Sequence, residues 1–176
     1  MTNARLVSAG LKRQIRRQFR LDPEGVHGPG HWARVYRYGL NLAAQTGADA
    51  RVVELFAFLH DSQRENEWKD PGHGARASEY ARWLYVKGAF ELEPSALSLL
   101  TIACDGHSDG ALVADITVQV CWDADRLDLG RVGTRPDPHR LCTEPARDLC
   151  YIEAAWEWSR GSSRGRNLPP ATLPNR

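Results

Sequence analysis

Residues 52–61, VVELFAFLHD, join a strongly apolar run directly to an imidazole and a carboxylate. Apolar side chains such as Phe56 and Leu59 recur at helical spacing, so the stretch predicts a helix of the core. His60 and Asp61 follow where this core ends. A buried helix that ends with two ionisable residues indicates a functional site where the hydrophobic core ends.

Helical periodicity extends over most of the chain, and no stretch shows sustained two-residue alternation. Breaks rich in proline and glycine, such as LDPEGVHGPG at residues 21–30, separate the periodic segments. We therefore expect an all-α, compact single-domain bundle of six or seven helices within residues 1–160. Residues 161–176 are rich in Gly, Ser and Pro and predict a flexible C-terminal tail. The predicted helices cover residues 5–20, 30–46, 50–65, 73–87, 94–106, 116–129 and 143–160.

Two helix ends carry recognisable signals. Gly47 follows the second predicted helix and is expected to be its C-cap. Thr143 precedes Glu144 and Pro145, so its hydroxyl is expected to cap the last helix while the proline occupies an early position that needs no donor.

The bulk composition fits one ordinary domain with a real core: 176 residues, of which 42% are hydrophobic and 26% charged. The net charge of +1 gives no field that would recruit nucleic acid, and the basic run at residues 11–20 is interpreted as a solvated helix face. No apolar run approaches the roughly 20 residues that cross a bilayer. Four scattered cysteines without a leading signal-type segment predict a reduced, cytoplasmic protein.

Polar residues interrupt two further apolar helix faces. His31 lies in the first turn of the helix predicted at 30–46, on the face continued by Val35 and Tyr38. Asp123 and Asp125 interrupt the apolar pattern of TVQVCWDADRLDLG at residues 117–130. Burying a carboxylate is costly unless a cation or hydrogen-bond donors compensate it. A metal ion between neighbouring helices would do so.

A family resemblance rests on these residues. HWARV at 31–35, LHD at 59–61 and DADRLDLG at 123–130 follow one another on successive predicted helices. In this order they resemble the HD-domain superfamily of metal-dependent phosphohydrolases, whose defining pattern is H, HD, D. The likeness extends from about His27 to Gly133 and implies an HD-type helical domain over residues 1–160.

The resemblance also implies a ligand set. Asp125 is chosen over Asp123 because the family's last aspartate precedes a basic–apolar pair, and Asp123 stays open as the alternative. Two neutral imidazoles and two carboxylates suit Mn, Fe, Co, Ni, Zn or Mg, with one or two ions per chain. The metal ligands implied in this way are His31, His60, Asp61 and Asp125.

Two further histidines fit the extended version of the superfamily, in which extra histidines hold a second metal. His73 opens the fourth predicted helix and His107 ends the fifth, both facing loops. They are interpreted either as ligands of a second ion or as contacts to the substrate phosphate. His27 is a weaker case of the same kind, and His139 is expected at the surface.

The implied reaction is hydrolysis of a phosphate ester or anhydride of a small molecule by metal-activated water, with nucleotides as the leading substrate class. Asp61 and Arg64 are the catalytic candidates, with Glu65 as the alternative acid or base. Guanidinium and ammonium groups suit phosphate oxygens. The candidate phosphate-binding residues are therefore Arg34, Lys69 and Arg126, together with His73 and His107, and Trp32 and Trp68 are candidates for stacking on a nucleobase.

Two other functions remain open at this point. One is a di-iron oxygenase on the same scaffold, with His73 and His107 supplying the extra ligands. The other is a noncatalytic, metal-stabilised binding module. The HD pair is followed by SQREN rather than by the IGK-type tail of many relatives, so no particular branch of the superfamily is implied. The substrate, the metal and the oligomeric state stay open.

Overall fold

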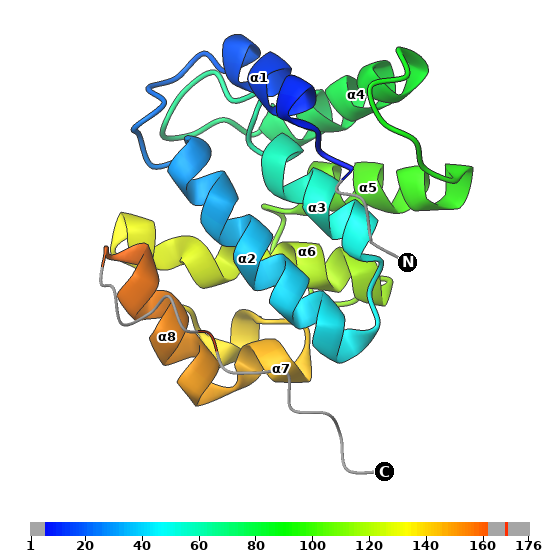
Figure 1. Cartoon of the computed structure of the whole chain (residues 1–176). Helices are drawn as coiled ribbons and strands as arrows, with labels where there is room; N and C mark the ends of the chain where they lie inside the picture. Colours follow the sequence, from blue (N-terminus) through cyan, green and yellow to red (C-terminus); the bar gives the residue numbers. More distant parts are fainter. Residues whose placement is uncertain (1–5, 162–167, 169–176) are drawn as a thin grey trace.

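The computed structural model describes residues 6–161 and 168, and these residues form helices without any strand (Figure 1). The all-α prediction is confirmed. The predicted tail at 161–176 lies outside the described residues except for residues 161 and 168. The elements are α1 (Ala9–Gln18), α2 (Pro29–Thr46), α3 (Ala50–Leu59), α4 (His73–Val86), α5 (Pro94–Gly106), α6 (Ile116–Arg126), α7 (Glu144–Arg147) and α8 (Leu149–Ser159), with 3₁₀ helices η1 (Leu127–Val132) and η2 (Pro138–Arg140).

Side-chain caps fix the start of several helices. The carboxylate of Asp49 accepts the backbone N–H of Arg51 at the start of α3, and Asp115 serves α6 in the same way. Pro29 occupies the first position of α2, where no donor is needed. Gly47 ends α2 at a φ of 77°, a left-handed conformation that favours glycine, as predicted.

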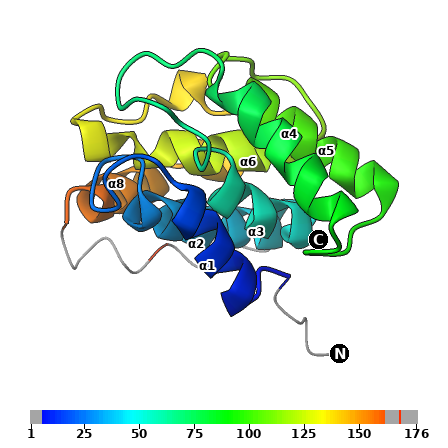
Figure 2. The same cartoon turned by 90° about the horizontal axis from the view of Figure 1, so that it is seen from above.

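The helices pack around a core that includes the fully buried Tyr38, Phe56, Leu59 and Leu127. In Figures 1 and 2, α2 packs against α3 and α6, and α4 runs beside α5. α3 also contacts α5 and α6. This arrangement brings the first turn of α2, the ends of α3, α5 and α6, and the start of α4 into one region.

Helix boundaries differ from the prediction at two places. α3 ends at Leu59, and the chain turns at residues 60–63 instead of continuing as helix to 65. The helix predicted at 143–160 is broken at Asp148, whose carboxylate accepts the N–H of Tyr151 and starts α8. Because of this break, the described residues contain eight α-helices instead of six or seven.

Thr143 is the N-cap residue of α7 and Pro145 lies in the first turn, as predicted, but the expected bond from the Thr143 side chain is absent. Its hydroxyl makes no capping bond at α7 and donates instead to the carboxylate of Asp123 at 2.8 Å. Asp123 also accepts the backbone N–H groups of Cys142 and Thr143, so it holds the chain just before α7. A tertiary partner therefore replaces the local capping bond.

The four cysteines are free thiols. Cys104 and Cys121 are buried, and burial raises the pKa of both thiols. In the described part of the chain, every helix is too short or too polar to span a bilayer.

Candidate metal centre

Side chains from α2, α6 and the turn after α3 converge on one point. The Nε2 atoms of His31 and His60 lie 3.0 Å apart. Asp61 Oδ2 lies 3.5 Å from His31 Nε2 and 3.6 Å from His60 Nε2. Asp125 Oδ1 lies 3.3 and 3.8 Å from the same two nitrogens. The structure therefore brings together the four residues that the H, HD, D pattern implies as ligands.

The early end of α3 explains how two adjacent residues reach the same point. Neighbouring side chains in a helix diverge by about 100°. His60 still donates its backbone N–H to Phe56, but the turn at residues 60–63 begins there and Asp61 lies within it. The site accordingly lies between helices, where His31 of α2 and Asp125 of α6 meet the residues that follow α3.

Both imidazoles of this group use their Nδ1 atoms elsewhere. The His60 Nδ1–H donates to the carbonyl of Phe56 at 3.1 Å, and His31 Nδ1 lies 2.7 Å from Asp128 Oδ2. Such partners fix the ring orientation and leave Nε2 as the coordinating atom. With Nδ1 protonated in both rings, the two facing Nε2 atoms require a cation between them, either a proton or a metal ion.

Electrostatics in the metal-free protein assign that proton to His31. Burial acts to lower the pKa of His31, but the nearby carboxylates of Asp125, Asp128 and Asp61 outweigh it and raise the pKa to about 9. Burial lowers the pKa of His60 to about 3, so this ring is neutral. Asp125 Oδ1 is buried and accepts no hydrogen bond. A buried carboxylate oxygen that accepts no hydrogen bond and lies beside a neutral imidazole fits a divalent cation.

A second group lies on the other side of Asp61. His73 at the start of α4 and His107 at the end of α5 place their Nε2 atoms 2.8 Å apart. Each nitrogen lies 3.5 Å from Asp61 Oδ1. The Nδ1 atoms bond to the backbone carbonyls of Asp70 and Cys104. This cluster repeats the arrangement of the first.

Asp61 is therefore shared, since Oδ2 faces one imidazole pair and Oδ1 faces the other. Ligand atoms lie within 4.8 Å of one another in three overlapping trios, which consist of imidazole nitrogens and carboxylate oxygens only: His31, His60 and Asp61; His60, His107 and Asp125; and Asp61, His73 and His107. Such ligands suit hard or borderline divalent ions. The residues present fit two neighbouring ions bridged by one carboxylate, or one ion in the His31–His60 group.

Asp128 is a site residue that the sequence interpretation missed. It is fully buried, and it accepts hydrogen bonds from the ring of His31 and from the guanidinium of Arg34 at 2.6 and 2.9 Å. Arg34 was predicted to bind phosphate. In the structure it pairs with the carboxylate of Asp128 instead. The signal was available in DADRLDLG, where a second aspartate follows Asp125 by three residues.

Arg131 is a second residue that the sequence interpretation missed. Its Nη2 lies 3.7 Å from Asp125 Oδ1, and its other nitrogens donate to the carbonyls of Val26 and Asp128. Arg64, by contrast, lies where expected: its Nη1 is 3.3 Å from Asp61 Oδ1. One guanidinium thus borders each carboxylate of the cluster. Nothing in the sequence around Arg131 distinguished it from the other arginines.

The structure also decides between the two aspartates of α6. Asp123 accepts three hydrogen bonds from Cys142 and Thr143, and burial raises its pKa. Its carboxylate is thus used to hold the chain, whereas Asp125 faces the histidines. Glu65, the alternative acid or base, forms an exposed ion pair with Arg20 at 2.7 Å.

Several other candidates lie apart from the cluster. Lys69 is exposed in the loop before α4, and Arg126 uses its guanidinium on the carbonyls of Arg140 and Ala111. Trp32 is 2% exposed and packs edge-on against Phe19, so it cannot stack on a nucleobase.

The remaining aromatic candidates and histidines lie at the edge of the site or beyond it. Trp68 is 90% exposed. His27 is buried beside His31 and bonds to Glu67 at 2.5 Å. His139 is exposed, as expected.

The helical arrangement matches a solved structure. A predicted HD superfamily hydrolase from an uncultured Thermotogales bacterium superposes with a TM-score of 0.66, and the match covers 86% of each chain at 23% sequence identity. The chain has the HD-domain fold. No protein-family model matches the sequence, and the search of curated proteins found no significant relative. The HD fold and the clustered ligands were thus both foreseen by the H, HD, D pattern.

Proposed function

We propose that this HD-fold protein is a metal-dependent phosphohydrolase acting on a small phosphorylated molecule. The single observation that carries the proposal is Asp61, whose two oxygens each face an imidazole pair, while the buried Asp125 Oδ1 beside them accepts no hydrogen bond. When bound there, a divalent ion supplies an activated water and polarises a phosphoryl oxygen. The structural neighbour is named a predicted HD superfamily hydrolase, and a hydrolase function is compatible with this proposal.

The chain's own residues have separable roles in this reaction. His31, His60 and Asp125 hold an ion, and Asp128 keeps the His31 ring oriented. Arg131 and Arg64 border the proposed ligands Asp125 and Asp61, so we assign phosphate binding to them in place of Arg34, which pairs with Asp128, and Lys69, which is exposed.

The reaction is an ordinary hydrolysis. The oxygen of water forms a bond to phosphorus and the bond from phosphorus to the ester oxygen breaks. One proton of the water ends on the alcohol, and inorganic phosphate is released. Arg131 and Arg64 offset the charge of the phosphoryl group during this exchange.

A panel of phosphomonoesters tested with Mn, Co, Ni, Zn and Mg would examine this function. We expect phosphate release with at least one ion, and we expect His60→Ala and Asp125→Ala each to abolish metal retention and activity together. His139→Ala is the matched control, because this histidine is exposed and outside the cluster. Full activity in both cluster variants would refute the mechanism.

The second imidazole pair also supports an alternative, a di-iron oxygenase. The sharing of Asp61 between two groups suits two ions, and His73 and His107 would complete the second. Metal analysis after anaerobic purification separates the two functions. Two irons per chain with oxygen uptake on a polyol would favour oxygenation, whereas phosphate release with added Mn or Co favours hydrolysis. A noncatalytic module would retain metal but turn over no member of either panel.

A further inference from the structure

A cavity of about 760 Å³ adjoins the metal centre. His107 and Asp125, which form one of the ligand trios together with His60, both line it, so the cavity opens onto the metal centre. The segment before α6 contributes Ser108, Gly110 and Leu112 to its wall, and the segments on either side of η2 contribute further residues, from Thr134 to Leu141. Its volume lies within the range of about 300–1,000 Å³ that is usual for small-molecule sites.

The lining of this cavity is aliphatic with a cationic edge. Leu112, Leu129, Pro136 and Leu141 provide apolar surface. Among the described residues that line it, none carries a phenyl, phenol or indole ring. The cationic edge is formed by Arg126, Arg135 and Arg140.

Two polar contacts hold the walls of the cavity in place. Arg126 donates to the carbonyls of Ala111 and Arg140, which joins the wall before α6 to the wall at η2. Asp123 fixes the chain that follows Leu141 through the N–H groups of Cys142 and Thr143. The cavity is therefore preformed, which limits the entropy lost when a ligand enters.

We propose that this cavity binds the organic part of the substrate and that this part is aliphatic, so that the preferred substrate is an alkyl-type phosphate monoester and not a nucleotide. The proposal rests on the phosphohydrolase function above. Aliphatic side chains favour an aliphatic ligand by excluding water from both surfaces. A nucleobase would find no phenyl, phenol or indole ring among the described lining residues, whose one aromatic ring is the imidazole of His107 at the metal centre. The cationic edge attracts the phosphate dianion toward the cavity.

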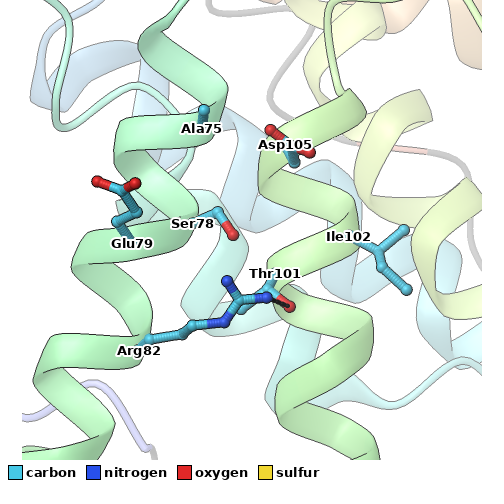
Figure 3. Close-up of a pocket in the computed structure, with 7 residues that line it drawn as sticks. All are labelled: Ala75, Ser78, Glu79, Arg82, Thr101, Ile102 and Asp105. Atoms are coloured by element: carbon cyan, nitrogen blue, oxygen red, sulfur yellow. Dashed lines mark hydrogen bonds between the residues drawn. The ribbon is translucent and has the colours of Figure 1, made fainter.

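A second cavity provides a control. Figure 3 shows it between α4 and α5, where Arg82 reaches across to Thr101 and donates to its hydroxyl at 3.2 Å. Its volume is about 240 Å³, and none of its lining residues belongs to either ligand group. Ile102 lines it and is 52% exposed, whereas Leu112 in the larger cavity is 36% exposed. The two residues form a matched pair for substitution.

The test compares alkyl phosphates from ethyl to hexyl with nucleoside 5′-monophosphates, using the full chain with added Mn. We expect kcat/KM to rise by about fourfold for each added methylene until the cavity is filled, and to exceed the values for the nucleotides. Leu112→Glu should reduce the length dependence to less than about twofold per methylene. Ile102→Glu should leave it unchanged.

Binding of the matching alkylphosphonates, measured by calorimetry, keeps the two proposals separate. Affinity that rises with chain length in the absence of turnover would contradict hydrolysis and support the cavity assignment. Chain-length independence in both turnover and binding would overturn the cavity assignment, as would a tenfold preference for nucleotides. Loss of length dependence in Ile102→Glu but not in Leu112→Glu would overturn it as well.

Discussion

Asp61 is the residue that joins the two ligand groups. It is buried, and although burial acts to raise the pKa of its carboxyl group, the imidazoles of His60, His107 and His31 hold that pKa well below the usual range. The carboxylate is thus charged throughout the physiological range and surrounded by nitrogens. Burying several polar and charged groups together costs free energy unless hydrogen bonds or opposite charges compensate them. We therefore expect a cation at this position.

Asp128 should matter as much as the ligands it supports. Asp128→Asn keeps the shape but removes the charge that orients His31 and pairs with Arg34. We expect metal affinity to fall by about 10–100-fold, measured by competition with a chelating dye. Asp105→Asn is the control, because Asp105 is exposed on α5. Equal affinities of Asp128→Asn and the unmodified protein would show that His31 needs no such support.

Metal binding should depend on pH through His31. Its pKa is raised from 6.5 to about 9, so at neutral pH an incoming ion must displace a proton. Apparent affinity for Mn should increase by about tenfold per pH unit between about pH 7 and 8.5. Titration calorimetry in buffers of different ionisation enthalpy should detect about one released proton. A flat affinity over this range would contradict the protonated state of His31.

The raised pKa of His31 also predicts how the free energy of unfolding changes with pH when no metal is bound. The folded-state pKa of His31 lies above its ordinary value, so its proton stabilises the fold fully below pH 6.5, and this contribution is lost as the pH rises to about 9. In the presence of a chelator, the free energy of unfolding should therefore decline over this interval.

At the scale of elements, the site is made by helix ends. His73 begins α4 and His107 follows α5, so the distance between these two helices sets the second imidazole pair. Gly74 allows the close approach: a Cβ atom there would lie 2.5 Å from the carbonyl oxygen of Asp105 and 2.7 Å from that of Cys104. Because both are backbone atoms, the helices would have to separate.

Gly74→Ala should accordingly disturb the second pair in particular. We expect the free energy of unfolding to fall by about 1–3 kcal/mol and the second ion, where two are bound, to be lost first. Chemical denaturation and elemental analysis measure these effects. Gly10→Ala is the matched control, since the nearest atom to a Cβ there is 3.6 Å away. Unchanged stability and stoichiometry in Gly74→Ala would mean that α4 and α5 do not position the pair.

At the scale of the whole molecule, a bound metal ion should cross-link several helices and so stabilise the bundle. Its ligands come from α2, α4 and α6 and from the residues that follow α3 and α5, so a bound ion links most of the bundle. An ion at 100 times its Kd stabilises the folded state by about 2.7 kcal/mol, or roughly 5–10 °C in Tm for a chain of this size. Thermal unfolding with and without a chelator measures this, and coincident curves would show that no ion is bound.

The sequence by itself predicted the helical class from apolar periodicity, and its resemblance to the HD pattern singled out the four residues that the structure brings together. Apolar periodicity predicts α2, α3 and α6, and polar residues that interrupt an apolar face identify His31, His60 and Asp125 without reference to their neighbours in space. Helix ends were less certain, as Asp148 shows: a carboxylate within a periodic segment started a new helix there.

Only the tertiary structure decided which charged groups serve the site. Arg34, Arg64 and Arg131 are equivalent in sequence, yet Arg34 pairs with Asp128 while the other two border the ligand carboxylates. The family resemblance had already favoured Asp125 over Asp123, and the structure gives the physical reason, since Asp123 is occupied by the chain before α7. A side chain's partner across the fold depends on how helices distant in sequence pack, and no local pattern encodes that geometry.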